Sequence, residues 1–225
     1  MYCLLKLKMT LQKLQTKKLF YGRWPYKVST RIQGAAYIRY RGFDNLHNLV
    51  KAKDAITGIL ATDMERYLDR LAPYVNDIQL RIEHYTVNMF CENRTMYDRL
   101  CRDFEPWLES VTEPASDDDL AVLLNRKKII LCNELPEGQY QYRVSFKTMP
   151  PDTKNTLGTW ASNNCPDRIG ISNTNKEQFD RHWPWANIWL YVKDSPTLTM
   201  LALVSQGYIS KVEEYIPRSS INIIS

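Results

Sequence analysis

The alternation of apolar and polar side chains predicts a β-strand at residues 26–32, close to the start of the chain. One face of this strand carries Tyr26, Val28, Thr30 and Ile32. The other face carries Lys27, Ser29 and Arg31. A second alternating segment at residues 36–41 follows the turn-forming residues 33–35. The sequence therefore predicts a β-hairpin with one face for a core and one basic face.

The rest of the chain alternates between helical and strand-like patterns. Apolar residues at three- and four-residue steps predict a long helix over 44–71, which Pro73 ends. Residues 77–93 are strand-like, and a change of phase at Glu83 and His84 predicts a bulge or a tight turn. Further helices are predicted at 95–108, 116–128, 174–182 and 195–207, and further strands at 140–147, 169–171, 188–193 and 209–216. The Pro-, Asn- and Thr-rich residues 149–167 are predicted to form a loop.

Two parts of the chain resemble each other. Residues 25–29 and 141–145 share an aromatic residue, a cation, valine and serine in the same order. In residues 87–114 and 188–217, a strand leads to a hydroxyl N-cap, Thr95 or Ser195, and then to a helix. An alternating segment with Val111 or Val212 follows in each case, and then a proline. These similarities predict a duplicated unit, with chance similarity of short segments as the alternative.

Each copy is expected to contain strand, helix, strand or strand pair, helix and strand, an order that fits the ferredoxin-like βαββαβ unit. The predicted fold class is therefore α+β, with two ferredoxin-like halves in tandem and helices on one face of each antiparallel sheet. The expected boundaries are a basic amphipathic segment at 1–18, halves at 19–115 and 137–218, a connecting helix in 116–136, and a tail at 219–225.

Positive charge is concentrated at the front of the chain. Residues 1–43 contain ten Lys and Arg, and the first acidic residue is Asp44, whereas the whole chain has a net charge of +5. Residues 17–41 combine seven of these cations with six interleaved aromatic residues. Cations suit a phosphate backbone and aromatic rings suit unpaired bases, so this stretch favours single-stranded RNA or DNA as a partner.

The residues expected to contact nucleic acid are cations and aromatics on or beside the predicted strands. They are Arg23, Trp24, Lys27, Arg31, Tyr37, Arg39 and Arg41 in the first half, and Arg143 and Lys147 in the second. The alternative interpretation of these residues is a solvated basic face on an ordinary domain. Arg41, Gly42 and Phe43 match only the opening of the RNA-recognition signature, and the following residues depart from it.

The five cysteines are widely spaced, with no Cys-x-x-Cys pair, so the sequence predicts free thiols in an intracellular protein. No apolar run is long enough to span a membrane. Leucines and lysines over residues 4–17 predict a short amphipathic helix. It is expected to pack on its own domain, to lie on anionic lipid or to cap a partner.

Two other functions remain open from the sequence. The first is a structural subunit of a homo-oligomer or larger particle, in which the acidic run 103–119 of one copy meets the basic front of another. The simpler interpretation of that run is a solvated helix face and linker. Trp183, Trp185 and Trp189 suit a core or a partner interface better than stacked bases.

The second is a metal-independent endoribonuclease that uses His182, with His84 and His47 as weaker candidates. No motif for nucleotide triphosphates, dinucleotides, zinc proteolysis or a serine nucleophile is present, and no cofactor is predicted. The sequence thus favours binding over catalysis.

Overall fold

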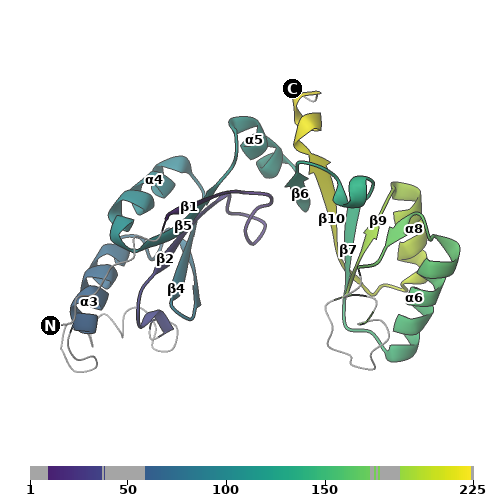
Figure 1. Ribbon diagram of the computed structural model, residues 1–225, viewed down its shortest axis with the longest axis horizontal. Helices are drawn as coiled ribbons and strands as arrows, with labels where there is room; N and C mark the ends of the chain where they lie inside the picture. The colour runs from purple at the N-terminus through teal and green to yellow at the C-terminus, as the bar shows by residue number, and fades with distance from the viewer. Residues whose placement is uncertain are drawn as a thin grey trace. The chain divides into compact units, whose positions relative to one another are not determined.

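The computed structural model describes residues 10–36, 38, 59–172, 175, 177 and 188–223 (Figure 1). The chain divides into two compact units, Met1–Leu120 and Ala121–Ser225, and each is described by itself. In the described residues, both units are mixed α+β structures, and each contains one five-stranded sheet.

The first sheet has the strand order β1-β5-β2-β4-β3. Its strands are β1 (Gln12–Gln15), β2 (Tyr26–Arg31), β3 (Gln79–Glu83), β4 (Thr86–Cys91) and β5 (Leu108–Glu113). Neighbouring strands are antiparallel, except that β1 runs parallel to β5. The helices α3 (Ile59–Leu71) and α4 (Arg94–Asp103) contribute to the core on one face, and the 3-10 turn η1 (Glu105–Trp107) leads into β5.

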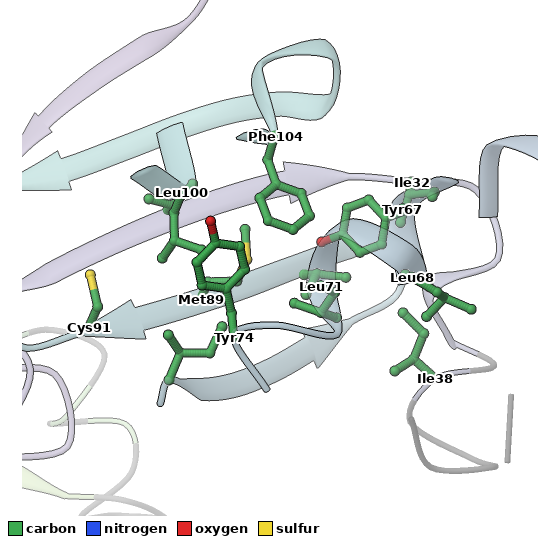
Figure 2. Close-up of a cluster of buried hydrophobic side chains, with 14 of the residues drawn as sticks. Ile32, Ile38, Tyr67, Leu68, Leu71, Tyr74, Met89, Cys91, Leu100 and Phe104 are labelled. Atoms are coloured by element: carbon green, nitrogen blue, oxygen red, sulfur yellow. The ribbon is translucent and has the colours of Figure 1, made fainter. Parts of the chain in front are cut away.

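The core of the first unit lies between this sheet and its helices (Figure 2). Val28 on β2 pairs with Met89 on β4 and with Val111 on β5, so a row of apolar side chains crosses the sheet. Leu100 from α4 packs in the same buried cluster. Tyr67 from α3 is also fully buried, and its hydroxyl lies 2.6 Å from the Thr30 hydroxyl, which gives this buried polar group a partner.

The second sheet has the order β6-β10-β7-β9-β8. Its strands are β6 (Ile129–Cys132), β7 (Tyr142–Phe146), β8 (Ile169–Gly170), β9 (Trp189–Val192) and β10 (Ile209–Pro217). The helices α6 (Pro151–Asn164) and α8 (Ser195–Val204) lie on one face and share its core (Figure 1). The helix α5 (Asp117–Asn125) precedes β6, and the 3-10 turns η2 (Pro136–Gly138) and η3 (Arg218–Ile223) complete the described elements.

The two sheets repeat the same pattern of pairing. The edge strands β1 and β6 are both parallel to their neighbours, β5 and β10, and the other pairs are antiparallel in both sheets. Val144 pairs with Leu190 and Val212, as Val28 pairs with Met89 and Val111. The predicted similarity of these segments therefore corresponds to equivalent places in the two sheets.

From β4 to β5 and from β9 to β10, the two units match without insertion or deletion. Equivalent positions lie 101 residues apart: Met89 and Leu190, Val111 and Val212, and the buried helix residues Leu100 and Leu201. The N-caps Asn93 and Asp194 also match, and each side chain accepts a backbone N–H three residues later. The prediction that the hydroxyls of Thr95 and Ser195 cap these helices is wrong, because the carboxamide of Asn93 and the carboxylate of Asp194 cap them instead.

The strand at 26–32 is confirmed, but the predicted hairpin with residues 36–41 is wrong. β2 is a central strand that pairs with β4 on one side and β5 on the other, so neither of its edges is free for a third partner. The described residues Ala35, Ala36 and Ile38 are helical. The expected tight turn is confirmed, since β3 and β4 form a hairpin through His84 and Tyr85.

Three other expectations change. The expected loop at 149–167 contains α6, in which Pro151 starts the helix; its buried residues include Lys154 beside Leu157 and Ala161, so its apolar pattern is weak. The helix predicted to reach residue 108 ends at Asp103, and Pro106 follows in η1, since proline lacks the N–H that a continued helix needs. Residues 12–15 form a strand rather than part of an amphipathic helix, and residues 1–9 lie outside the described residues.

Candidate nucleic-acid interface

We call the face of each sheet opposite to its helices the open face. On the first sheet it is formed by alternate residues of the paired strands: Lys27, Ser29 and Arg31 on β2, Thr86, Asn88 and Phe90 on β4, and Ser110 and Thr112 on β5. The alternation of 26–31 therefore places Lys27 and Arg31 on the side that the sequence predicted. Ser29, Asn88, Ser110 and Thr112 are buried, although they lie on the face away from the helices.

A concavity of about 400 Å³ lies on this open face. Its lining is almost entirely polar: Lys27, Ser29, Arg31, Glu83, His84, Tyr85, Thr86, Asn88, Glu109 and Ser110. The Ser29 hydroxyl donates to Oδ1 of Asn88 at 2.7 Å, and the Asn88 amide lies 3.4 Å from Glu83. These bonds fix a polar floor between the central strands.

The carboxylate of Glu109 lies at one end of the concavity. The Thr86 hydroxyl donates to its Oε2 at 3.1 Å, and Arg31 Nη1 lies 3.6 Å from its Oε1. Glu109 is the extra residue of a β-bulge, because Ser29 pairs with Ser110 while Thr30 pairs with Leu108. The bulge turns Glu109 toward the open face, where strict alternation would have placed it against the helices.

Lys27 is half-buried in the middle of this face. Its ammonium lies 5.6 Å from the centre of the Phe20 ring, and the carboxylates of Glu83 and Glu109 are close enough to act on its charge. Burial lowers the pKa of Lys27 from its ordinary value, and the two carboxylates oppose this effect only in part. The lysine is thus held where its charge is poorly solvated.

The turn before β2 holds the predicted residues Arg23 and Trp24. The Arg23 guanidinium lies 4.3 Å from the centre of the Trp24 ring and also contacts the Glu92 carboxylate at 2.5 Å. Phe20 and Tyr21 pack against Phe90 with ring centres 5.1 and 5.2 Å apart. This turn therefore covers the part of the open face around Phe90 on β4. Arg23 is paired with a carboxylate.

The open face of the second sheet is aromatic. Arg143 on β7 pairs with Tyr191 on β9 and with Glu213 on β10, so these side chains share the face. The Arg143 guanidinium lies 4.8 Å from the centre of the Trp189 ring. The Tyr191 ring lies 6.0 Å from Tyr140 and 6.2 Å from Tyr215, which makes a row of three tyrosines.

Some charged and polar groups on this second face have partners, and others have none among the described residues. Lys211 Nζ lies 2.8 Å from the buried Glu213 carboxylate. Burial raises the pKa of Tyr215 to about 12, with a smaller contribution from Tyr191, so its hydroxyl is protonated at neutral pH. Arg143 Nε and the indole N–H of Trp189 are buried, and neither has a hydrogen-bond partner among the described residues.

The remaining predicted binding residues lie at the margin of an open face or outside the described residues. Lys147 follows β7, is exposed, and its Nζ lies 3.4 Å from the Gly207 carbonyl. Tyr37, Arg39, Arg41, His47, His182, Trp183 and Trp185 lie outside the described residues. Sequence reasoning assigned no binding role to Tyr191 or Tyr215, and it considered Glu109 only as a member of the acidic run 103–119. The alternation of residues 188–193 indicates which residues share a face with Tyr191. Only the pairing of Tyr191 with Arg143 shows that this face is the open one.

The acidic run 103–119 is only partly the solvated face that was expected. Asp117 and Asp118 are exposed at the start of α5. Glu113 forms an ion pair with Arg94, Glu109 is bound as described above, and Asp103 accepts a hydrogen bond from Tyr74. The strand β5 interrupts the helix face that the charge pattern suggested.

The part of the chain that the structure describes contains no cluster of side chains suited to a metal ion. None of its helices has the length and apolar character needed to cross a bilayer. Its four cysteines, Cys91, Cys101, Cys132 and Cys165, are free thiols. No protein-family model matches the chain, and comparison with curated proteins and with solved structures finds no significant similarity.

The partial burial of the Lys27 ammonium has a testable effect on stability. Because the pKa of Lys27 is lower in the folded state, the charged lysine disfavours folding at neutral pH, and stability recovers as the pH rises toward the unfolded pKa of 10.5. We expect Lys27→Met to raise the urea midpoint of unfolding at pH 7 and to lose this advantage as the pH rises toward 10.5. The exposed Lys147→Met is the matched control. A lower midpoint for Lys27→Met at pH 7 would mean that its attraction to Glu83 and Glu109 outweighs its burial.

Proposed function

We propose that the protein binds single-stranded nucleic acid on the open faces of two tandem ferredoxin-like units. The order β2, α3, β3, β4, α4, β5 supports this assignment for the first unit, as does the antiparallel order β5-β2-β4-β3 within its sheet. The second unit repeats both features in β7 to β10, and each unit adds one parallel edge strand. The open face of such sheets is a common platform for unpaired bases.

The observation that carries the proposal is the contact of Arg143 with Trp189 beside the row of tyrosines. An arginine on an indole ring, next to Tyr191, offers both a phosphate partner and surfaces on which bases stack. The unpartnered N–H groups of Arg143 and Trp189 add a reason for a ligand. Buried donors without partners cost about 1–3 kcal/mol each, and phosphate or base oxygens would satisfy them.

The first sheet supports the same function through its equivalent positions. Lys27 occupies the place of Arg143, since each precedes by one residue the valine at the centre of its sheet. Arg31 likewise corresponds to Lys147. Here Lys27 lies over the Phe20 ring, but most groups around the two cations are carboxylates, hydroxyls and an amide, so this face suits phosphate and sugar groups better than stacked bases.

Single strands are the expected partner because stacking requires unpaired bases. Trp189→Ala should weaken binding of a single-stranded oligonucleotide by about 5- to 150-fold, the equivalent of about 1–3 kcal/mol per stacked base. Arg143→Ala should reduce the slope of log affinity against log salt by about 0.7, since one phosphate contact is lost. Fluorescence anisotropy titrations at several salt concentrations measure both effects, with a duplex of the same sequence for comparison.

The matched control is Arg102→Ala, which removes an exposed cation from α4 on the opposite side of the first sheet. It should leave both affinity and salt slope close to those of the unchanged protein. Equal affinity for duplex and single strand, or an Arg143→Ala slope no different from that of Arg102→Ala, would contradict the proposed role of the second open face.

A second candidate function is assembly, and the outer side of α8 favours it. Met200 and Leu203 are 46 % and 77 % exposed there. The equivalent residues on α4 are Arg99 and Arg102, so the same position in the repeat is charged in one unit and apolar in the other. Exposed apolar side chains at such a position favour a protein interface.

If α8 mediates self-association, the double variant Met200→Glu with Leu203→Glu should be monomeric in multi-angle light scattering, whereas the unchanged protein should be oligomeric. Arg99→Glu on α4 is the matched control, and it should not change the molar mass. A monomeric unchanged protein at micromolar concentration would exclude assembly through this helix.

A further inference from the structure

The concavity on the first open face combines groups that phosphate chemistry requires. Two backbone features meet at one end of it. The bulge of β5 turns Glu109 toward the open face, and the β3–β4 turn holds His84 in a left-handed conformation, with φ of 53°. A two-residue hairpin loop requires a positive φ, and histidine adopts it more readily than most other non-glycine residues, so the turn itself fixes His84 beside the concavity.

Hydrogen bonds hold this turn beside the end of β2. The Ile32 N–H donates to the Tyr85 carbonyl at 2.9 Å, so His84 and Tyr85 lie next to Arg31. Thr86, two residues after His84, donates to Glu109. Glu109, His84 and Arg31 thus come from three separate strands or turns and line the same concavity, with Lys27 further along β2.

The second unit provides an internal comparison. Its strand β10 has the same bulge, because Ile209 pairs with Phe146 and Lys211 with Ser145. The bulged residue is Ser210, and its hydroxyl donates to the Ser145 carbonyl at 2.9 Å. The bulge therefore occurs in both units, whereas only the bulge of the first unit carries a carboxylate.

We propose that this concavity cleaves RNA by transfer of the phosphodiester to the neighbouring 2′-hydroxyl, with Glu109 as general base and His84 as general acid. Glu109 takes the proton of the 2′-hydroxyl, and the 2′ oxygen forms a bond to phosphorus. The bond from phosphorus to the 5′ oxygen breaks, and the imidazolium of His84 gives its proton to that oxygen. The products are a 2′,3′-cyclic phosphate and a 5′-hydroxyl, and exchange with water restores both protonation states.

The remaining groups have roles in holding the substrate. Lys27 and Arg31 offer positive charge to the phosphate as negative charge develops on its oxygens. The contacts of Glu109 with Arg31 and Thr86 hold its carboxylate on the open face, where a general base would meet the substrate. Ser29 and Asn88 supply a polar floor for the ribose. This inference goes beyond the proposed function, since cleavage at the first sheet does not depend on the aromatic face of the second.

The test uses the full chain, a single-stranded RNA labelled at its 5′ end, and an excess of a metal chelator. Cleavage should leave 2′,3′-cyclic phosphate ends, and a substrate with 2′-deoxyribose at every position should stay intact. Glu109→Gln and His84→Asn should each lower the rate by about 10²- to 10⁴-fold. Asparagine tolerates the left-handed backbone at position 84, and Glu105→Gln, on η1 outside the concavity, is the control.

The same preparations are also titrated with uncleavable 2′-deoxy oligonucleotide by fluorescence anisotropy, which separates this inference from the proposed function. Intact RNA with the unchanged protein, or full activity in Glu109→Gln, would overturn the nuclease while binding through Arg143 and Trp189 stood. Cleavage that Glu109→Gln abolishes, with binding and unfolding midpoint retained, would support it. Cleavage of the 2′-deoxy substrate would overturn it, because the mechanism requires a 2′-hydroxyl.

Discussion

Pairing of the central strands on both sides is the constraint on which the rest of the structure depends. β2 bonds to β4 and β5, and β7 bonds to β9 and β10, so the backbone groups of each strand are satisfied within its sheet. Val28 and Val144 must then face the helices. Since side chains alternate along a strand, Lys27 and Arg143 must face the other way. The core thus determines where the cations lie.

Patterns within single elements were predictable from the sequence, and partners far apart in the chain were not. The alternation of residues 26–31, the turn at His84 and the duplication of Val111 in Val212 could all be inferred from local order. The choice of β4 and β5 as neighbours of β2 depends on pairing between residues 55 to 85 positions apart, which adjacent turn residues do not reveal. Helix α6 was missed because only a narrow stripe of it is buried.

The two open faces share a pattern of strand pairing and differ in the side chains that it presents. Equivalent positions on β2 and β7 both carry a cation followed by valine and serine, so the backbone position of the charge is common to both units. Their surroundings differ, because Asn88 on β4 corresponds to Trp189 on β9. The concavity of the first face is therefore lined mainly by hydrogen-bonding groups and carboxylates, whereas the second face carries a row of rings. The sequence did not show which side chains of different strands share each face, because this depends on which strands pair.

The most direct test of the account is to map where nucleic acid touches the chain. A single-stranded oligonucleotide carrying 4-thiouridine is cross-linked to the full protein with ultraviolet light, and the adducts are located by mass spectrometry of the peptides. The account predicts adducts on the open face of the second sheet, at Trp189, Tyr191 or Tyr215. Adducts confined to α6 and α8, on the opposite face of the same sheet, would contradict it.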